Sequence, residues 1–310
     1  MIDWVDYKGG QFCRISDQSW QYNFLFSLDD NQTSLTLNEF GVKEKDIKSI
    51  WLRRSGAKKQ PDLSHIDNSY EFKRKLSQLL WRESDILRTG LLKMLKNKPC
   101  LSSFETITPN KIDMLLLAKQ ARLTVPATCI TASKKEMLEF IKKYHKVITK
   151  NISDADIFNL DTLSYMQYTE EITPELLDSY DDNMYACLLQ EKIEKEVELR
   201  IFYLHGNCYG MAIFSQLDDQ TATDFRNYNT VTPNRNVPYQ LPKEIEENIR
   251  TFMKSASLDT GSIDMIKTHD DKYIFLEVNP VGQFGMTSYP CNYFLEEKIA
   301  DWLLHPTSTK

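Results

Sequence analysis

Apolar and polar positions along the chain follow two different periods, which together predict a protein of mixed helices and strands. Stretches in which apolar and polar residues alternate predict strands, whereas apolar residues three or four apart predict amphipathic helices. We expect strands at 11–15, 20–27, 34–37, 47–52, 127–130, 146–150, 188–193, 198–204, 209–214, 262–266 and 272–279. We expect helices at 70–96, 111–122, 134–143, 243–257 and 292–304. Residues 151–185 contain no glycine and are predicted to hold a strand or hairpin and a helix near 174–180.

The order of these elements divides the chain into three predicted parts. Residues 1–105 combine strands with one long helix, 106–188 alternate short helices and strands, and 189–310 return to a sheet with flanking helices. The predicted fold class is therefore mixed α/β (α+β). With 310 residues, of which 41% are hydrophobic, the chain has enough apolar material to bury a sizeable core.

Two polar side chains interrupt the last apolar strand. Glu277 and Asn279 are two residues apart, so a pleated strand would direct both toward one face. Asp264 lies in the preceding strand, and the turn at 269–272 predicts that the two strands form a hairpin. If they pair, three oxygen-bearing side chains converge, and such donors suit Mg²⁺. Taken singly, each residue fits a solvent-facing strand position equally well.

The net charge of −6 is spread along the chain, which argues against a nucleic-acid or anionic-membrane surface. The six cysteines form no CxxC pair and the five histidines form no HExxH motif, so we expect reduced thiols in a cytoplasmic protein. No apolar run is long enough to span a membrane, and the acidic start does not fit a signal peptide. Because the charge is spread along the chain, any anion-binding site must consist of a few neighbouring residues rather than a broad basic surface.

Several cations lie at the ends of predicted elements. Arg53 and Arg54 end an apolar strand, where an exposed strand end explains them as well as a functional site does. Lys111 begins a helix and Lys150 ends a strand, and a lysine in such a place is more often solvated than functional. Because the chain has neither GxxxxGK[ST] nor GxGxxG, these lysines do not belong to a P-loop or a Rossmann site.

The chain contains seven short segments whose order is more telling than any one of them: NK (110–111), VITK (147–150), QEKI (190–193), ELR (198–200), TDFR (223–226), GSIDMI (261–266) and LEVNP (276–280). In order and approximate spacing they resemble the ATP-grasp superfamily, particularly the branch that contains the ribosomal S6 glutamate ligase. The segments SIWLRRSG, TDFRNYNTVTPNRNVPYQLP and LEVNPVGQFGMTSYPCNYFLEEKIA are similar to graspetide (microviridin-like) macrocycle ligases of the grasp-with-spasm type. This resemblance covers nearly the whole chain.

The resemblance implies an ATP-grasp fold. The N-terminal part (1–105) would be a pre-ATP-grasp α/β domain, the central part (106–188) a small lid domain, and the C-terminal part (189–310) an antiparallel-sheet domain. Two features depart from the family pattern. Residues 151–185 lack the glycine-rich loop that often closes over the phosphates, and the sequence begins inside the region where relatives usually have one more strand.

The resemblance also assigns roles to residues, with ATP and Mg²⁺ as cofactors. Five residues match the nucleotide site, where they would contact phosphates, adenine and ribose: Lys111, Lys150, Gln190, Ile193 and Glu198. Three match the metal ligands: Asp264, Glu277 and Asn279. Arg226 matches the arginine that faces the transferred phosphate and the acceptor carboxylate, where a planar fork can grip two oxygens. Arg235 and Asn229 are candidates for holding the acidic substrate side chain, and a loop hydrogen bond explains them equally well.

The implied function is ATP-dependent formation of ω-ester or ω-amide crosslinks in a ribosomal precursor peptide. Its leader segment would bind away from the active site, and we expect a homodimer with no nucleic-acid or membrane partner. One alternative is an amino-acid or glutamate ligase of the RimK-like branch that acts on a protein or peptide. Another is a non-catalytic peptide-binding homologue.

Overall fold

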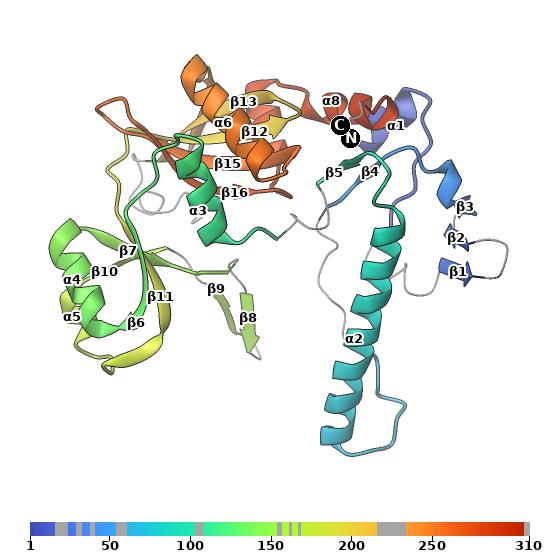
Figure 1. Cartoon of the computed structure of the whole chain (residues 1–310), viewed down its shortest axis with the longest axis horizontal. Coiled ribbons are helices and arrows are strands. Elements are labelled where there is room, and N and C mark those ends of the chain that lie inside the picture. Colours follow the sequence, from blue (N-terminus) through green and yellow to red (C-terminus); the bar gives the residue numbers. More distant parts are fainter. Residues whose placement is uncertain are drawn as a thin grey trace. The chain divides into compact units, whose positions relative to one another are not determined.

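The computed structural model describes residues 1–15, 24–28, 33–37, 41–53, 61–102, 108–153, 157–160, 163–166, 169–215 and 234–306 (Figure 1). The chain forms two compact units. The first unit combines Met1–Ile107 with Phe294–Lys310, and the second comprises Thr108–Tyr293. The predicted C-terminal helix thus belongs to the first unit, although the three-part division places it in the third part. That division, at 105/106 and 188/189, stays a prediction.

The first unit joins both ends of the chain. Its elements are α1 (Ile2–Tyr7), β1 (Phe24–Leu28), β2 (Thr33–Leu37), β3 (Val42–Lys43), η1 (Glu44–Asp46), β4 (Ile50–Trp51), α2 (Tyr70–Met94), β5 (Cys100–Leu101) and α8 (Leu295–Leu304). β1, β2 and β3 form an antiparallel sheet, and β4 pairs with β5 in parallel. Lys8 anchors the segment after α1 to α8 through ion pairs with Glu297 and Asp301. The strand predicted at 11–15 is wrong, because no described strand pairs with these residues.

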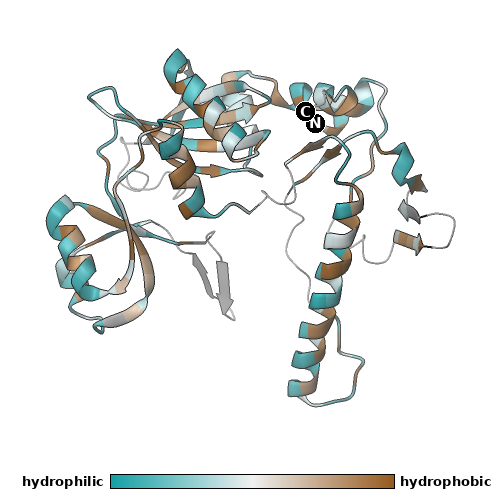
Figure 2. Ribbon diagram, viewed as in Figure 1, coloured by the Kyte–Doolittle hydropathy of each residue, from teal (hydrophilic) through white to brown (hydrophobic). Residues whose placement is uncertain are grey.

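Helix α2 is long, and only its C-terminal end is buried. Ser69 caps the start of the helix by accepting a hydrogen bond from the backbone N–H of Phe72. Leu91 and Leu95 pack against Ile47 and Ile50. Figure 2 shows brown bands of hydrophobic residues along α2. Several large side chains nearer the start of the helix are exposed: Tyr70, Phe72, Leu79, Leu80, Ile86 and Leu87. The helix predicted at 70–96 is confirmed, and most of its apolar stripe is exposed.

The second unit contains a four-stranded antiparallel sheet in the order β10, β7, β11, β6. Its elements are β6 (Thr128–Ser133), α4 (Lys134–Tyr144), β7 (Val147–Lys150), β10 (Glu170–Ile172), α5 (Pro174–Leu177) and β11 (Asn183–Glu191). The strands β8 (Ile157–Leu160) and β9 (Leu163–Met166) form a separate hairpin. Val147 and Leu189 share one face of the sheet and pack against Met137 and Ile141 of α4. This face is therefore the small core of the sheet.

A five-stranded antiparallel sheet forms the larger part of the second unit, in the order β14, β13, β12, β15, β16. Its elements are α3 (Lys111–Gln120), β12 (Val197–Leu204), β13 (Asn207–Phe214), β14 (Arg235–Tyr239), α6 (Lys243–Ser255), β15 (Thr260–Lys267), β16 (Tyr273–Asn279) and α7 (Gly285–Cys291). One face carries Leu199, Ile263 and Phe275, which pack with α3 and α6 in the main core. Phe252 of α6 meets Phe275 edge to face, with ring centroids 4.9 Å apart.

Strand β16 contains a β-bulge at Leu276. Phe275 lies opposite Met265 and Glu277 lies opposite Asp264, so Leu276 is an extra residue between the two pairs. Phe275 and Glu277 therefore lie on opposite faces of the sheet, although they are only two residues apart. The bulge frees the second face for polar residues while Phe275 stays in the core.

The C-terminal end of the second unit covers part of that second face. Met211 and Ile213 of β13 pack with Cys291 of α7. The hydroxyl of Tyr293 donates a hydrogen bond to the carbonyl oxygen of Gly210 (2.6 Å). Within the described part of the chain, no helix is both long and apolar enough to cross a membrane.

Candidate functional site

The register of the five-stranded sheet brings the predicted metal ligands to one face. Asp264 lies opposite Glu277, and Ser262 lies opposite Asn279. Arg200 of β12 lies opposite Asp264 on the other side of β15. Residues that face each other across antiparallel strands project to the same side. We call this side the carboxylate face, defined by Glu198, Arg200, Ser262, Asp264, Glu277 and Asn279. The predicted hairpin is confirmed, and the ligand role of its side chains stays a prediction.

Asp264 is held by a buried ion pair. Nη1 of Arg200 donates to both carboxylate oxygens of Asp264, at 2.7 and 2.6 Å, and each residue is only 8% exposed. Both charges are removed from water, and breaking a buried ion pair by removing one partner typically costs about 3–5 kcal/mol. A single nitrogen makes both contacts, and Nε of Arg200 is buried without a hydrogen-bond partner.

Glu198 forms a second buried cluster on this face. Its carboxylate accepts hydrogen bonds from Lys195 and from the hydroxyl of Ser215, the latter at 2.8 Å. Burial raises the pKa of the Glu198 carboxyl above its usual value, while Lys195 and Ser215 oppose that rise. The resemblance assigns Glu198 to ribose hydroxyls. In this structure its Oε1 atom already accepts two hydrogen bonds.

Asn279 ends β16 in a tight turn. Its side-chain oxygen accepts a hydrogen bond from the backbone N–H of Val281 (3.1 Å). The turn then brings Gly282 so close to Ser262 that a Cβ atom at residue 282 would collide with the serine side chain. Only glycine fits this approach, which fixes the end of β16 against β15.

Four buried polar atoms on or beside this face lack a hydrogen-bond partner: Arg200 Nε, Asn236 Oδ1, Ser262 Oγ and Thr287 Oγ1. Asn236 lies opposite Ile213, which shares the side of Glu198, so it projects to the carboxylate face as well. An unpaired buried polar atom costs about 1–3 kcal/mol. A polar ligand on this face would recover part of that cost.

The predicted phosphate lysines lie around the end of β7. Lys111 begins α3, where Asn110 caps the helix, and its ammonium donates to the carbonyl oxygens of Asn151 (3.0 Å) and Ser153 (2.8 Å). Both carbonyls lie within three residues after Lys150, the last residue of β7. Two lysines 39 positions apart are therefore brought to the same strand end.

Lys150 and Gln190 project from the face of the four-stranded sheet opposite α4. Lys150 pairs with Leu188 and Gln190 pairs with Ile148, whereas Val147 and Leu189 face α4. Gln190 is buried, and its Nε2 donates to the hydroxyl of Thr128 (2.9 Å). Ile193 is half-buried in the short connection between β11 and β12. Lys150 and Gln190, predicted to contact phosphate and adenine, thus lie on one side of this sheet. Ile193, the other predicted adenine contact, lies in the connection that follows β11.

Of the three predicted substrate contacts, Arg235 alone lies within the described residues, and it is not on the carboxylate face. Arg226 and Asn229 lie outside the described residues. Arg235 begins β14 opposite Phe214, and this pair projects to the core side of the sheet. Its guanidinium lies over the ring of Phe214, 5.6 Å from the ring centre. The role of Arg235 stays a prediction, and its neighbour Asn236 is the better-placed residue of β14.

The donor set of the carboxylate face fits a magnesium ion. Asp264 and Glu277 offer two carboxylates and Asn279 offers one amide oxygen, which are hard oxygen ligands. Among the described residues, no group of three or more His, Cys, Asp and Glu side chains could hold a metal ion. Any ion would therefore depend on the amide of Asn279 and on oxygens supplied by a ligand.

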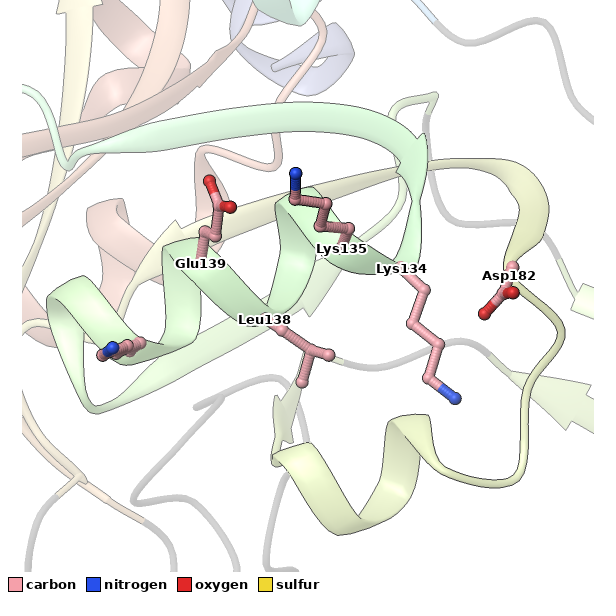
Figure 3. A pocket seen from close by; sticks show the side chains of 6 residues that line it. Lys134, Lys135, Leu138, Glu139 and Asp182 are labelled. Carbon is pink, nitrogen blue, oxygen red and sulfur yellow. The ribbon is translucent and has the colours of Figure 1, made fainter.

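A shallow pocket lies elsewhere, on α4 (Figure 3). Its lining consists of Lys134, Lys135, Leu138, Glu139, Lys142 and Asp182. The Lys134 ammonium donates to the carbonyl oxygen of Tyr180 (3.2 Å), so this cation stabilises the end of the α5 segment. The pocket includes none of the predicted site residues.

Comparison with known families identifies the domain that carries these faces. Residues 108–303, more than half of the chain, match the RimK-like ATP-grasp domain. The chain belongs to the RimK-like ATP-grasp family. The match covers all the predicted nucleotide and metal residues, from Lys111 to Asn279. A search of curated proteins found no match.

Solved structures similar to this RimK-like protein span its whole length. One is a RiPP-associated ATP-grasp ligase from Chryseobacterium gregarium in complex with ADP and a leader and core peptide, with TM-score 0.84, 24% identity, and coverage of 99% of this chain and 92% of that one. Another is the macrocyclase MdnC from Microcystis aeruginosa MRC bound with the precursor peptide MdnA, with TM-score 0.79, 26% identity, and coverage of 99% and 95%. A third is the ATP-grasp ligase PsnB complexed with minimal precursor, Mg and ADP, with TM-score 0.75, 15% identity, and coverage of 97% and 91%. The ATP-grasp fold predicted from the sequence is confirmed.

Sequence reasoning missed four polar residues of this RimK-like site: Lys195, Arg200, Asn236 and Ser262. Arg200 stands in the ELR segment and Ser262 in the GSIDMI segment, so their positions two residues from Glu198 and Asp264 were the available signal. Lys195 and Asn236 lie outside any periodic pattern. Their placement follows from the connections that lead into β12 and β14.

Proposed function

We propose that this protein is an ATP-dependent macrocyclase that forms ω-ester or ω-amide crosslinks between side chains of a ribosomally made precursor peptide. The observation that carries the proposal is the 26% identity, over 99% of this chain, to a macrocyclase bound with its precursor peptide. The carboxylate face supports it, because a RimK-like ATP-grasp domain with an oxygen-donor face is suited to nucleotide chemistry.

In the proposed site, Lys111 and Lys150 bind the phosphates of ATP. Gln190 and Ile193 contact adenine, and Glu198 contacts ribose. Asp264, Glu277 and Asn279 hold Mg²⁺, which when bound offsets the negative charge of the phosphates. The hydrogen bonds from Lys111 to carbonyl oxygens next to Lys150 support this assignment, because they gather the two cations around one strand end.

The proposed crosslinking reaction has two steps. A carboxylate oxygen of a peptide Asp or Glu attacks the γ-phosphorus of ATP, and the bond to the β–γ bridging oxygen breaks, giving an acyl phosphate and ADP. A Thr or Ser hydroxyl, or a Lys amine, of the same peptide then attacks the acyl carbon. Phosphate leaves, the nucleophile loses its proton, and an ester or amide remains. Arg226 is proposed to grip the phosphoryl oxygens, so catalysis is mainly positioning and electrostatics.

The proposed partner is a precursor peptide whose leader binds apart from the reacting core. Leader binding raises the local concentration of the core for successive reactions. We further propose a homodimer, supported by the exposed apolar side chains of α2. A cytoplasmic location is part of the proposal and is supported by six cysteines that form no disulfide bond.

The mass of the product tests this function. The protein is incubated with a candidate precursor peptide that carries Thr and acidic residues, together with ATP and Mg²⁺. Macrocyclisation predicts the loss of one water per crosslink, measured by mass spectrometry. A gain of one amino-acid residue would instead support a RimK-like amino-acid ligase, which the family match favours as the second candidate. Absence of both products and of phosphate release would favour a peptide-binding homologue.

A further inference from the structure

The carboxylate of Glu198 is held through one of its two oxygens. The ammonium of Lys195 and the hydroxyl of Ser215 both donate to Oε1, the latter at 2.8 Å. Oε2 accepts no hydrogen bond from the described residues, yet it is not one of the fully buried polar atoms without a partner. The two oxygens therefore have different environments, in which Oε1 fixes the side chain and Oε2 is accessible to a ligand.

Lys195 is unusually buried for a lysine. Only 8% of its side chain and 9% of the Glu198 side chain are exposed. Lysine and glutamate are almost never buried to this extent unless they are paired. Lys195 lies just before β12 and Ser215 just after β13, and these two strands pair with each other. Both donors to Glu198 thus come from the same end of one hairpin.

The connection that leads into β12 is anchored on both sides of Lys195. Glu194 forms an ion pair with Lys146, which lies just before β7 (2.8 Å). Glu196 forms an ion pair with Lys267 at the end of β15, and its backbone N–H donates to the carbonyl oxygen of Lys267 (2.9 Å). A single exposed ion pair stabilises little, whereas several that act on one short segment restrict it together. The connection is therefore fixed to both sheets of the second unit, with Lys195 directed to Glu198.

The charges around Glu198 decide whether its carboxyl group is ionised. Burial raises the pKa of this carboxyl, and the negative charge of Asp264 on β15 adds to the rise. Lys195 and Ser215 oppose the rise, because they bond to the ionised form. The neighbours of Glu198 on this face are uncharged on β13 and cationic along β12 itself: Ile213, Ile266 of β15 and Arg200. Removal of Lys195 would therefore let Glu198 take up a proton at a higher pH.

We propose that Lys195 is a positioning residue for the sugar of the nucleotide: together with Ser215 it holds Oε1 of Glu198, so that the ionised Oε2 accepts hydrogen bonds from the ribose hydroxyls. Hydroxyl groups can donate, and an ionised carboxylate only accepts, so the two are complementary. A hydrogen bond to an ionised acceptor is about twice as strong as one between neutral groups. This inference rests on the proposed function, in which Glu198 contacts ribose. It adds that preference for ribose over deoxyribose depends on a lysine that acts through Glu198.

The test compares the affinities of the full-length protein for ADP, 2′-deoxy-ADP and 3′-deoxy-ADP, measured by isothermal titration calorimetry with Mg²⁺ at neutral pH. The larger ratio of a deoxynucleotide Kd to the ADP Kd is the ribose discrimination. In the wild type we expect it to be at least about tenfold, as for hydrogen bonds to a charged group. In Lys195→Met, which fills a similar space without the charge, it should fall to about threefold, as for a bond between neutral groups.

The pH profile of the ribose discrimination gives a second readout. The discrimination should decline as the pH falls, because Glu198 becomes protonated and loses its charge. The midpoint of this decline should lie at a higher pH in Lys195→Met than in the wild type, because the lysine no longer favours the ionised carboxylate. A purely structural loss would weaken all three nucleotides alike and would leave both the ratio and its midpoint unchanged.

Three further variants serve as controls. Lys192→Met removes a lysine of the same connection that pairs with Glu171 instead of Glu198, and it should keep the wild-type ratio. Glu198→Gln should reduce the ratio as Lys195→Met does. The double variant should lose no more than either single variant, because both changes act through one carboxylate. If Lys195→Met loses its circular dichroism signal, Lys195→Gln, which keeps a polar group without the charge, replaces it.

Wild-type ribose discrimination in a folded, uncharged Lys195 variant would overturn the inference and leave the proposed function intact. An equal loss in Lys192→Met would also overturn it, because the connection as a whole would then set the ratio. Equal affinity of the wild type for all three nucleotides would overturn both the inference and the ribose role of Glu198, while crosslink formation would still support the macrocyclase. A wild type that binds none of the nucleotides would overturn the proposed function as well.

Discussion

At the scale of single residues, the polar positions of β16 are explained by their partners on β15. Asn279 faces Ser262 and Glu277 faces Asp264, so the two polar side chains that interrupt an apolar strand belong to one shared face. The sequence shows that Glu277 and Asn279 are two residues apart in a strand, so it was possible to predict that they share a face. The contribution of Arg200 was not predictable, because it depends on which strand borders β15 on its other side.

Replacing Glu277 by Gln and Asn279 by Ala removes one carboxylate and one amide oxygen from the carboxylate face. We expect the double variant to lose turnover by at least about a hundredfold, as when a group that stabilises developing charge is removed. Affinity for the leader part of the precursor should stay nearly unchanged, because leader binding is proposed to lie elsewhere. Phosphate release and fluorescence-based leader titration measure the two effects. Equal loss of both would mean that the pair has a structural role.

Arg226 is the proposed contact to the reacting phosphoryl group. Arg226→Ala should cost at least about 2.7 kcal/mol of transition-state stabilisation, by analogy with the loss of one oxyanion donor. Steady-state kinetics of ADP formation in the presence of precursor peptide measure this cost. Arg53→Ala is the matched control, because it also removes an arginine but lies outside the residues that match the family. Wild-type kcat/KM in Arg226→Ala would refute the assigned role.

Cys208 should be chemically inert in the folded protein. Burial raises the pKa of its thiol to about 12. Because the thiolate is the reactive form, only about one molecule in ten thousand carries it at pH 8. We expect iodoacetamide to leave Cys208 unmodified in native protein at pH 8, as measured by peptide mass spectrometry. The unfolded protein, in which this thiol regains its ordinary pKa, provides the control and should be modified at this position.

At the scale of elements, the sequence predicted most helices and strands of the second unit but not β14 or α7. β14 contains Pro238, which lacks a backbone donor, and it lies at the edge of the sheet, where proline is tolerated. α7 contains Pro290 and begins at Gly285, both of which argue against a helix when read locally. Packing of Cys291 against Met211 and Ile213 offsets these weak local preferences. Tertiary contacts, which the sequence does not display, decided both elements.

The close approach of Gly282 to Ser262 gives a prediction about the turn after β16. Gly282→Ala should destabilise the protein by about 1–3 kcal/mol, because the new methyl group collides with Ser262 and forces the turn away from β15. Thermal unfolding measures the loss, and Mn²⁺ binding in the presence of nucleotide should weaken with it. Gly90→Ala in α2, where no atom lies within 4 Å of the new Cβ, should be neutral or stabilising. Equal unfolding temperatures in both variants would contradict the crowding at Gly282.

At the scale of the whole molecule, helix α2 offers an apolar stripe that its own unit leaves exposed. Phe72, Leu79 and Ile86 recur every seven residues, which is two helical turns, and all three are exposed. A 25-residue helix is about 37 Å long, which is enough to pair with a second copy over several turns. The sequence predicted the helix, but it could not show that the stripe points away from the core.

The proposed homodimer should therefore depend on this stripe. Ile86, at 69% exposure, costs little to replace in the monomer, yet Ile86→Glu would place a charge within the proposed contact. We expect the dimer dissociation constant to rise at least about tenfold, a change of 1.4 kcal/mol, as measured by sedimentation velocity over a range of concentrations. Gln78→Glu adds the same charge off the stripe and should leave the dimer intact. A monomeric wild type, or a dimer that is unaffected by Ile86→Glu, would rule out this surface.

The extra residue Leu276 decides which face of the sheet each later side chain of β16 takes. Before it, Phe275 serves the core, and after it, Glu277 and Asn279 serve the opposite face, although all three have odd numbers. In a regular strand of the same sequence, without the bulge, Glu277 and Asn279 would project to the side of Phe275, and apolar neighbours would take their places on the carboxylate face. The register shift at the bulge therefore keeps the core residue Phe275 and the site residues Glu277 and Asn279 on opposite sides of the sheet.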